Sequence, residues 1–324
     1  NPGERMYLLL LSSDGHHKLF MNNLFYLDHE LDIEQVWYSD TDNYLQLLAD
    51  EFDGACSIGI DKNFPARFLI PLMNLVDECH FELGSECVDR VRMIKDEKEQ
   101  QLMIEASKIN DLVVDEVINI CAKGNLTEEE VSKQLEEIYQ KHGCVGNSFE
   151  PIVAYGKNGA DNHHSGDDSR LKVGDSIVID IGGLYKGYCS DMTRTVFYKE
   201  VSPKQKTVYE LVLKAQKAAE AMIKPGVRLC DIDKCARDII AEGGYTVEFN
   251  HRLGHFIGRD VHEWCDVSQN FDLEVQEGMT FSIEPGVYLQ GEFGVRIEDL
   301  VLVTKDGCKV LNSYPKDLRV IGND

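Results

Sequence analysis

An acidic residue lies on each side of a glycine-bounded turn at residues 183–187. Asp180 ends the apolar run 177–179 before this turn, and Asp191 follows it. A β-hairpin centred between residues 185 and 186 would place the two carboxylates directly opposite each other. Opposed like charges destabilise a sheet, and buried carboxylates must be protonated, paired or bound to a cation. The pair therefore predicts a partner for these carboxylates, which is a proton, a basic side chain or a metal cation.

A second hairpin repeats this arrangement. A pairing centred on Gly291 places Glu284 opposite Glu298. One alternative is that all four acids are exposed residues beside turns, as most acidic residues are. Another is a salt-bridged network that uses Arg194 and Arg296. Because two arginines cannot neutralise four carboxylates whereas two divalent cations can, we favour a site for two metal ions.

One histidine completes the predicted ligand set. His255 lies between Gly254 and Gly258, and glycines permit close approach of the backbone. Four carboxylates and one imidazole favour manganese, cobalt or iron(II), with zinc less favoured. A water held between two such cations loses a proton near neutral pH and becomes a nucleophile. The predicted metal ligands are Asp180, Asp191, His255, Glu284 and Glu298.

The elements that must position these ligands begin near residue 93. Apolar residues at helical spacing predict a long helix from about residue 95, and Thr127 with Glu130 forms a capping box that begins a second helix. Ser202 with Pro203 begins another pair of helices. Strands or hairpins follow each helix pair, at 151–155, 176–181 and 188–198, and again at 281–289 and 295–303. The order helix, helix, strands, hairpin therefore occurs twice and predicts a repeated architecture.

The first region, 1–92, predicts a small α/β domain with no cluster of chemically active residues. Short apolar runs alternate there with turns. The predicted strands are 6–11, 18–20, 35–38 and 56–60, and the predicted helices are 43–51 and 63–75. The chain enters its first apolar run directly after Asn1-Pro-Gly-Glu-Arg, so we expect further residues upstream of Asn1.

The residues of the second region resemble the pita-bread metallopeptidases, a family that includes aminopeptidase P, prolidase and methionine aminopeptidase. The motifs that carry the resemblance are Asp180-Ile-Gly-Gly, Tyr188-Cys-Ser-Asp191-Met-Thr-Arg-Thr, Gly254-His255, Asp260-Val-His262-Glu, Phe281-Ser-Ile-Glu284-Pro-Gly-Val-Tyr288 and Gly294-Val-Arg296-Ile-Glu298-Asp. The resemblance implies an α+β fold with a pita-bread catalytic domain at 93–324 that has a pseudo-twofold repeat. Region 1–92 resembles the creatinase-type N-terminal domain in a truncated form.

The resemblance also implies a role for each metal ligand. Asp191 and Glu298 would bridge the two metals. Asp180 would bind one metal, and His255 together with Glu284 would bind the other. Glu284 would in addition act as the general base.

Further residues take roles only through the resemblance. It places His163 near the substrate, with its neighbour His164 as an alternative, and it assigns support of the tetrahedral intermediate to His262. The predicted catalytic residues are His163, His262 and Glu284. The predicted substrate-binding residues, which match proline-directed members of the family, are His251, Tyr288 and Arg296.

The function that the resemblance implies is hydrolysis of a Xaa-Pro bond, in a dipeptide or at the N-terminus of a longer peptide. We expect two divalent metal ions, with manganese as the first choice, and a homodimer. The alternatives are a methionine aminopeptidase-like exopeptidase, a metal-free creatinase-like amidinohydrolase and a non-catalytic peptide-binding module on the same fold. Because methionine aminopeptidases lack the first region, the proline-directed group is favoured.

Two residues near the histidine motif depart from the family pattern. Phe256 stands where glycine is common, and Arg259 stands where an aliphatic residue is common. Both lie beside the predicted site in the sequence, so we expect them to change the shape of the substrate pocket.

The charge balance argues against two classes of partner. Lysine and arginine number 33 against 57 aspartates and glutamates, a formal net charge of -24. Such a surface disfavours nucleic acids and anionic membranes, whose phosphates attract cations. The ten cysteines form no Cys-x-x-Cys pair, as is typical of reduced cysteines, and no apolar run reaches the roughly 18 residues of a membrane span. We therefore expect a cytoplasmic protein.

Overall fold

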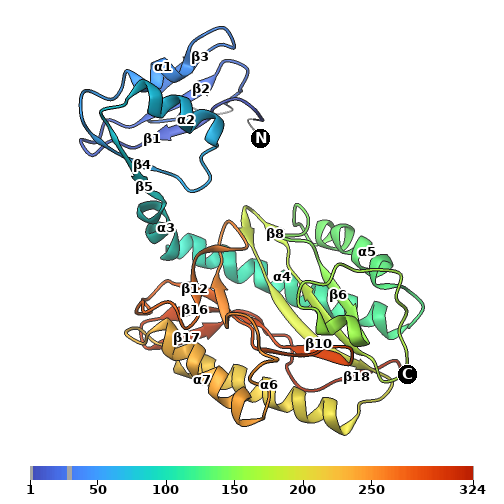
Figure 1. Ribbon diagram of the computed structural model, residues 1–324. Coiled ribbons are helices and arrows are strands. Elements are labelled where there is room, and N and C mark those ends of the chain that lie inside the picture. The colour runs from blue at the N-terminus through green and yellow to red at the C-terminus, as the bar shows by residue number, and fades with distance from the viewer. Residues whose placement is uncertain (1–2, 28–30, 324) are drawn as a thin grey trace. The chain divides into compact units, whose positions relative to one another are not determined.

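The structure is a computed structural model that describes residues 3–27 and 31–323. Its residues divide into two compact units, Asn1–Val88 and Asp89–Asp324 (Figure 1). The boundary between the units falls within helix α3 (Ser85–Met93). All of the predicted site residues belong to the second unit.

The first unit contains two small sheets and the helices that pack on them. Its elements are β1 (Leu8–Leu10), β2 (Lys18–Asn22), β3 (Glu34–Tyr38), α1 (Tyr44–Ala49), β4 (Ser57–Ile60), α2 (Ala66–Leu75) and β5 (His80–Leu83). One sheet has the order β1-β2-β3, and β4 pairs in parallel with β5. The predicted strands and helices are all present. Strand β5 and helix α3 were not predicted; both are short and mostly exposed.

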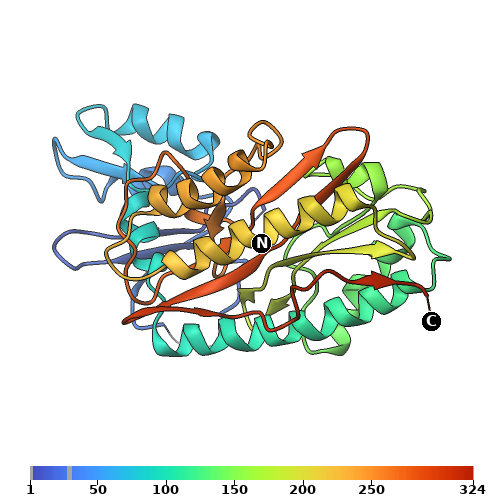
Figure 2. The ribbon, with the colours of Figure 1, turned by 90° about the horizontal axis from the view of Figure 1, so that it is seen from below.

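The second unit is built on two pairs of helices. Helices α4 (Glu97–Ala122) and α5 (Glu128–Lys141) pack against each other, and so do α6 (Pro203–Met222) and α7 (Leu229–Glu242). The side chains of Thr127 and Ser202 cap α5 and α6, as the sequence predicts. In Figure 1 the α6–α7 pair runs along the lower edge of this unit, and Figure 2 shows the same pair from below.

Each helix pair packs on a sheet of its own. The first sheet has the order β18-β10-β7-β6 and consists of β6 (Ile152–Tyr155), β7 (Ser176–Ile181), β10 (Met192–Tyr198) and β18 (Val320–Ile321). The second sheet has the order β12-β11-β13-β16-β17 and consists of β11 (Gly254–Phe256), β12 (Glu263–Val267), β13 (Thr280–Ile283), β16 (Asp299–Thr304) and β17 (Gly307–Val310). Separate apolar cores fill the two halves. This arrangement confirms the predicted repeat.

The register of the first hairpin differs from the prediction by two residues. Strands β7 and β10 place Asp180 opposite Thr193 and not opposite Asp191. The turn is centred between Lys186 and Gly187, whose φ angles of 48° and 83° form a tight two-residue loop. A lysine with positive φ is uncommon, so this turn centre could not be expected from the sequence. Because the shift is an even number of residues, the two aspartates still share one face of the hairpin.

The second hairpin has the predicted register. Strand β14 (Gly286–Leu289) pairs with β15 (Phe293–Arg296) around Gly291, and β13 pairs with β16 in the same alignment. Glu284 and Glu298 lie opposite each other in the gap between these two ladders. The predicted single strand 281–289 is therefore broken in two. Pro285, which has no N–H to donate, occupies the break.

Candidate metal centre

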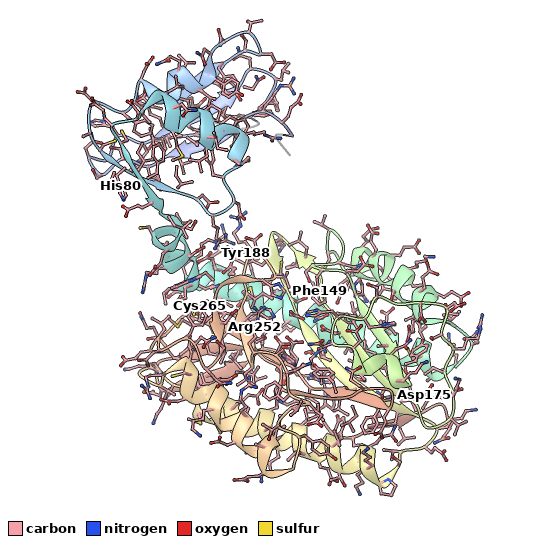
Figure 3. All side chains as sticks on the ribbon, viewed as in Figure 1. His80, Phe149, Asp175, Tyr188, Arg252 and Cys265 are labelled. Carbon is pink, nitrogen blue, oxygen red and sulfur yellow. The ribbon has the colours of Figure 1, made fainter. Side chains whose placement is uncertain are left out.

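The five predicted metal ligands line one cavity of about 720 Å³. Asp180 lies near the end of β7 and Asp191 immediately precedes β10, whereas His255 is the middle residue of β11. Glu284 follows β13, and Glu298 lies between β15 and β16. Both halves of the unit thus contribute ligands. Other residues of the cavity wall include Phe149 and Arg252, which are labelled in Figure 3.

Neighbouring side chains hold one oxygen of two of these carboxylates. Arg296 Nη2 donates to Asp180 Oδ2 at 2.6 Å, and Thr193 Oγ1 donates to Glu298 Oε2 at 2.7 Å. Arg296 Nε in turn donates to Thr193 Oγ1 at 3.0 Å. These contacts fix the orientation of carboxylates from two different hairpins.

The remaining oxygens of the same groups have no donor. Asp180 Oδ1, Asp191 Oδ1 and Glu298 Oε1 are buried and have no hydrogen-bond partner among the described residues. Buried acceptors without partners are rare, because leaving one unsatisfied costs about 1–3 kcal/mol. Three of them in one cavity fit a site in which cations take the place of donors.

The imidazole of His255 is oriented for ligation. Its Nδ1 lies 3.2 Å from the carbonyl oxygen of Phe256, and because a carbonyl only accepts, Nδ1 carries the proton. Nε2 then presents a lone pair at 3.5 Å from both Asp191 Oδ2 and Glu284 Oε1. Gly254 allows this placement, since a Cβ there would lie 1.9 Å from the carbonyl oxygen of Ser282 on the adjacent strand. The prediction of close backbone approach is confirmed at this glycine.

The electrostatics of the cluster favour added positive charge. Burial, followed by repulsion from neighbouring carboxylates, raises the pKa values of Asp191 and Glu298 well above the usual range. Burial also raises the pKa of Glu284 to about 7 and lowers the pKa of His255, which keeps that ring neutral. Oxygen donors, one neutral imidazole and a surplus of negative charge fit two divalent cations.

The alternative of an arginine network does not account for this charge. Arg296 faces the cavity and contacts Asp180, but Arg194 faces away and pairs with Asp299 at 2.7 Å. One guanidinium among four carboxylates is insufficient. The other alternative, exposed acids beside turns, fails because Asp191 and Glu298 are buried.

A second acidic group makes the surroundings of His163 and His164 different. Glu128 is fully buried, and its carboxylate accepts from Tyr155 N at 2.6 Å, from Asn158 and from Asp167 N. His164 Nε2 lies 2.7 Å from Glu128 Oε2. Protein donors thus already surround this carboxylate, although Glu128, His164 and Asp167 lie at metal-ligand spacing. Both histidines line the cavity, but His164 is held by Glu128, whereas His163 is exposed.

The predicted substrate-binding residues form a chain of hydrogen bonds. Arg296 Nη1 donates to the Tyr288 hydroxyl at 2.8 Å, and this hydroxyl lies 3.0 Å from His251 Nε2. His251 Nδ1 donates to the carbonyl oxygen of Arg252 at 2.7 Å, so the hydroxyl proton points to Nε2. His262 also lines the cavity, with its ring 4.4 Å from the ring of His255. Desolvation, followed by repulsion from His255, lowers the pKa of His262 to about 4.

The structure corrects the expectation for the two departures from the family pattern. Phe256 is fully buried and its ring packs on Phe281, 5.2 Å away, in the core of the second half. Because alternate residues of a strand face opposite sides, His255 faces the cavity while Phe256 faces the core. Arg259 is exposed, and neither residue lines the cavity.

Thr193 and Ser282 are site residues that sequence reasoning missed. Thr193 holds Glu298, and Ser282 Oγ donates to Glu284 Oε1 at 3.1 Å and accepts from His255 N at 3.0 Å. Their spacing was a usable signal. Each hydroxyl lies two residues from a ligand, and residues two apart in a strand face the same side.

The fold and the site together define a metallopeptidase with the pita-bread fold. The model of metallopeptidase family M24 matches residues 101–305, and the model of the creatinase/prolidase N-terminal domain matches residues 2–94. The chain belongs to metallopeptidase family M24.

No helix among the described residues is long and apolar enough to cross a membrane.

One relative in sequence and two solved structures support this assignment. The chain is 40% identical over 273 residues to the Xaa-Pro dipeptidase of Pyrococcus horikoshii, covering 83% of this chain and 78% of the relative. A crystal structure of the prolidase from Thermococcus sibiricus matches with a TM-score of 0.93 and 34% identity, covering 99% of this chain and 89% of that one. The X-Pro aminopeptidase from Thermotoga maritima matches with a TM-score of 0.83 and 32% identity, covering 97% and 90%.

Proposed function

We propose that this chain is a dinuclear metallo-exopeptidase that hydrolyses Xaa-Pro bonds in dipeptides or at the N-terminus of longer peptides. The observation that carries the proposal is the convergence of five ligands with three buried oxygens that lack a donor. Two divalent cations, when bound, supply Lewis acidity and a water that is deprotonated near neutral pH. The names of the Pyrococcus and Thermococcus relatives support the choice of substrate.

The side chains of the cavity provide the proton transfers and the positioning. Glu284 takes a proton from the attacking water and delivers it to the leaving proline nitrogen, while Ser282 fixes one of its oxygens. His262, on the cavity wall beside His255, donates to the oxygen of the scissile carbonyl. His163, which is exposed in the cavity wall, contacts the substrate from the loop at 161–165. The chain of His251, Tyr288 and Arg296 forms the wall beside the proline ring.

Several finer features belong to the same proposal. Manganese is the preferred metal because four of the five donors are carboxylates. The creatinase-type domain spans 1–92 and the catalytic domain 93–324. The ten cysteines are all free thiols in the structure, which supports a reducing, cytoplasmic location. A homodimer is proposed from the family resemblance.

A substrate-length series tests the function. Xaa-Pro, Xaa-Pro-Yaa-Zaa and a peptide with N-terminal Met but no following proline are assayed with manganese and after chelation. We expect cleavage of the proline-containing substrates and loss of activity with chelator. Preference for the Met peptide would indicate a methionine aminopeptidase-like enzyme, and the absence of stoichiometric metal would indicate a non-catalytic module.

A matched pair of variants tests the metal centre. Asp191→Ala should abolish metal binding and turnover together, because the Oδ1 atom of this residue is buried without a protein donor. Asp306→Ala, which changes an exposed aspartate between β16 and β17, should leave both unchanged. Turnover by Asp191→Ala would contradict the proposed role.

A further inference from the structure

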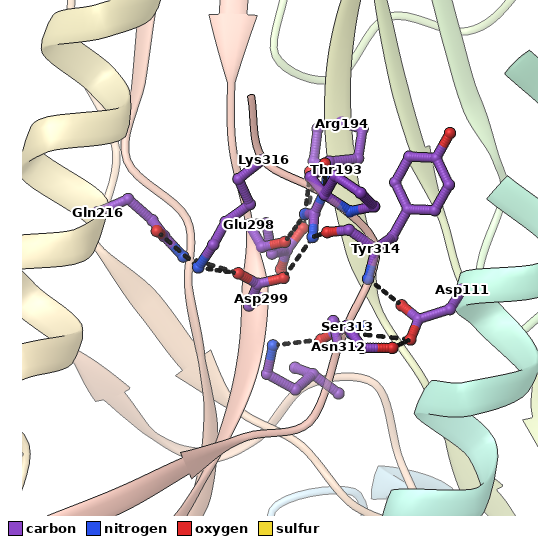
Figure 4. Close-up of polar contacts among 12 residues, drawn as sticks. Asp111, Thr193, Arg194, Gln216, Glu298, Asp299, Asn312, Ser313, Tyr314 and Lys316 are labelled. Carbon is purple, nitrogen blue, oxygen red and sulfur yellow. Dashed lines mark hydrogen bonds and ion pairs between the residues drawn. The ribbon is translucent and has the colours of Figure 1, made fainter. Parts of the chain in front are cut away.

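A buried arginine contacts the backbone of Thr193 and of Glu298, one of the proposed ligands (Figure 4). Arg194, on β10, is only 2% exposed. A guanidinium has five N–H groups, and here five oxygens receive them. The contacts are Nε to Pro315 O (3.3 Å), Nη1 to Thr193 O (2.9 Å) and Glu298 O (2.6 Å), and Nη2 to Asp299 Oδ1 (2.7 Å) and Tyr314 O (2.8 Å). The side chain therefore has a single fully satisfied geometry.

Two of these five acceptors belong to residues of the metal centre. Nη1 binds the backbone carbonyls of both Thr193 and Glu298. The side chains of the same two residues meet on the cavity side, where Thr193 Oγ1 donates to Glu298 Oε2. Arg194 thus ties β10 of the first half to the start of β16 in the second half. It does so at the point where a proposed bridging ligand enters the cavity.

The charges around Arg194 balance among themselves. Its partner Asp299 is fully buried, and Asp299 Oδ2 also lies 2.6 Å from Lys316 Nζ. Lys316 contacts Glu220 as well, at 3.0 Å. Two cations and two carboxylates make a neutral group. Arg194 therefore acts on the metal centre through geometry and adds no net charge to it.

We propose that Arg194 is a positioning residue for the metal centre. By holding the backbone of Thr193 and Glu298, it sets the direction in which the Glu298 carboxylate presents its free oxygen. The inference rests on the proposed function, since it assumes that Glu298 is a metal ligand. Outer-shell groups of this kind typically change metal affinity about 10–100-fold when removed.

A suitable control residue holds the same C-terminal segment from another side. Asp111, on α4, accepts from Ser313 N at 2.8 Å and from Tyr314 N at 3.2 Å. No hydrogen bond or ion pair joins Asp111 to Arg194, Glu298 or Asp299 within the described part of the chain. Asp111→Asn therefore loosens the segment around residues 313–314 without touching the metal centre.

The test compares Arg194→Met, Arg194→Lys and Asp111→Asn by titration of the metal-free protein with cobalt(II). Visible absorption reports both the affinity and the coordination geometry, and circular dichroism shows that each variant is folded. We expect cobalt binding about 10–100-fold weaker in Arg194→Met, with a changed spectrum. Arg194→Lys retains the charge but not the five donors, so it should show a smaller loss. Asp111→Asn should match the original chain.

The outcomes separate this inference from the proposed function. If the original chain binds no cobalt, the proposed function fails. If it binds cobalt and Arg194→Met binds it with the same affinity and spectrum, the positioning role is wrong. Equal weakening by Arg194→Met and Asp111→Asn would also overturn it, because the effect would then arise from the C-terminal segment. If Arg194→Met does not fold, Arg194→Lys decides by the same criteria.

Discussion

Replacing Tyr288 by phenylalanine removes one hydroxyl from the wall of the cavity and nothing else. The tyrosine is 3% exposed, and its hydroxyl accepts from Arg296 Nη1 and donates to His251 Nε2. Phenylalanine preserves the ring, so no large cavity forms. The change therefore isolates the polar contribution of this hydroxyl.

The size of the effect follows from the two groups left behind. Arg296 loses the acceptor for one buried N–H, and His251 loses the donor to Nε2. Each unsatisfied buried group costs about 1–3 kcal/mol, so the free energy of unfolding should fall by about 2–6 kcal/mol. Domains of ordinary stability have about 5–15 kcal/mol, so the variant should remain folded at neutral pH.

Two assays check the reasoning. Urea unfolding of the metal-free protein measures the free energy, and kcat/KM with a Xaa-Pro dipeptide measures function, which should fall about 10–100-fold as for other outer-shell changes. The matched control is Tyr209→Phe, which removes a hydroxyl that donates only to the carbonyl oxygen of Lys316 at 3.1 Å. A loss below about 1 kcal/mol for Tyr288→Phe, no larger than the control, would refute the bridging hydroxyl.

Three further predictions concern pH, the histidine loop and the metals. Burial, and then the charge of Arg296, lower the pKa of His251 to about 3, whereas an unfolded histidine has a pKa near 6.5. The unfolded chain therefore binds a proton at this histidine before the folded chain does. As a result, the free energy of unfolding falls as the pH drops from about 6.5 to about 3. His251→Gln should flatten that fall in unfolding free energy, and an unchanged profile would contradict the shift. Glu128→Gln should lower kcat/KM, because Glu128 organises the loop that carries His163, while the metal content measured by elemental analysis stays constant. Loss of metal would mean that the substitution acts on the metal centre and not on this loop. Chelation should lower Tm, and added manganese should restore it, because one bound ion at a free concentration 100 times its Kd adds about 2.7 kcal/mol to the free energy of unfolding. A Tm insensitive to both would contradict the metal site.

The grouping of the five proposed ligands in one cavity could be predicted from the sequence because its signals are local. Asp180, Glu284 and Glu298 interrupt or end apolar strand patterns, and a carboxylate in such a position needs a partner. The first register was wrong because the turn depends on Lys186 in a positive-φ conformation, which composition does not reveal. An even error in register preserves the face of every residue, so the predicted site survived it.

The contacts between distant segments could not be predicted. Glu128 reads as an ordinary acid in the first turn of a helix, yet it is buried and organises the loop that carries His163. Phe256 was placed beside the pocket because it follows His255 in the sequence, whereas strand alternation sends it into the core. The arginine-network alternative pairs Arg194 with the predicted ligand carboxylates, but in the structure Arg194 binds four backbone carbonyls and the carboxylate of Asp299, which is not one of them.

Breaks between strands explain how carboxylates from two sheets reach one cavity. In an unbroken ladder, opposed side chains stand side by side and roughly perpendicular to the sheet, so the ladder fixes the direction of each carboxylate. Asp191 lies between β9 and β10, Glu284 follows β13, and Glu298 lies between β15 and β16. At each break the backbone leaves the ladder, which lets the side chain depart from the regular alternation. A broken strand needs other support, and Arg194 provides it at Glu298 by binding the carbonyl that the ladder leaves free. The irregular backbone and the buried arginine are thus two parts of one arrangement.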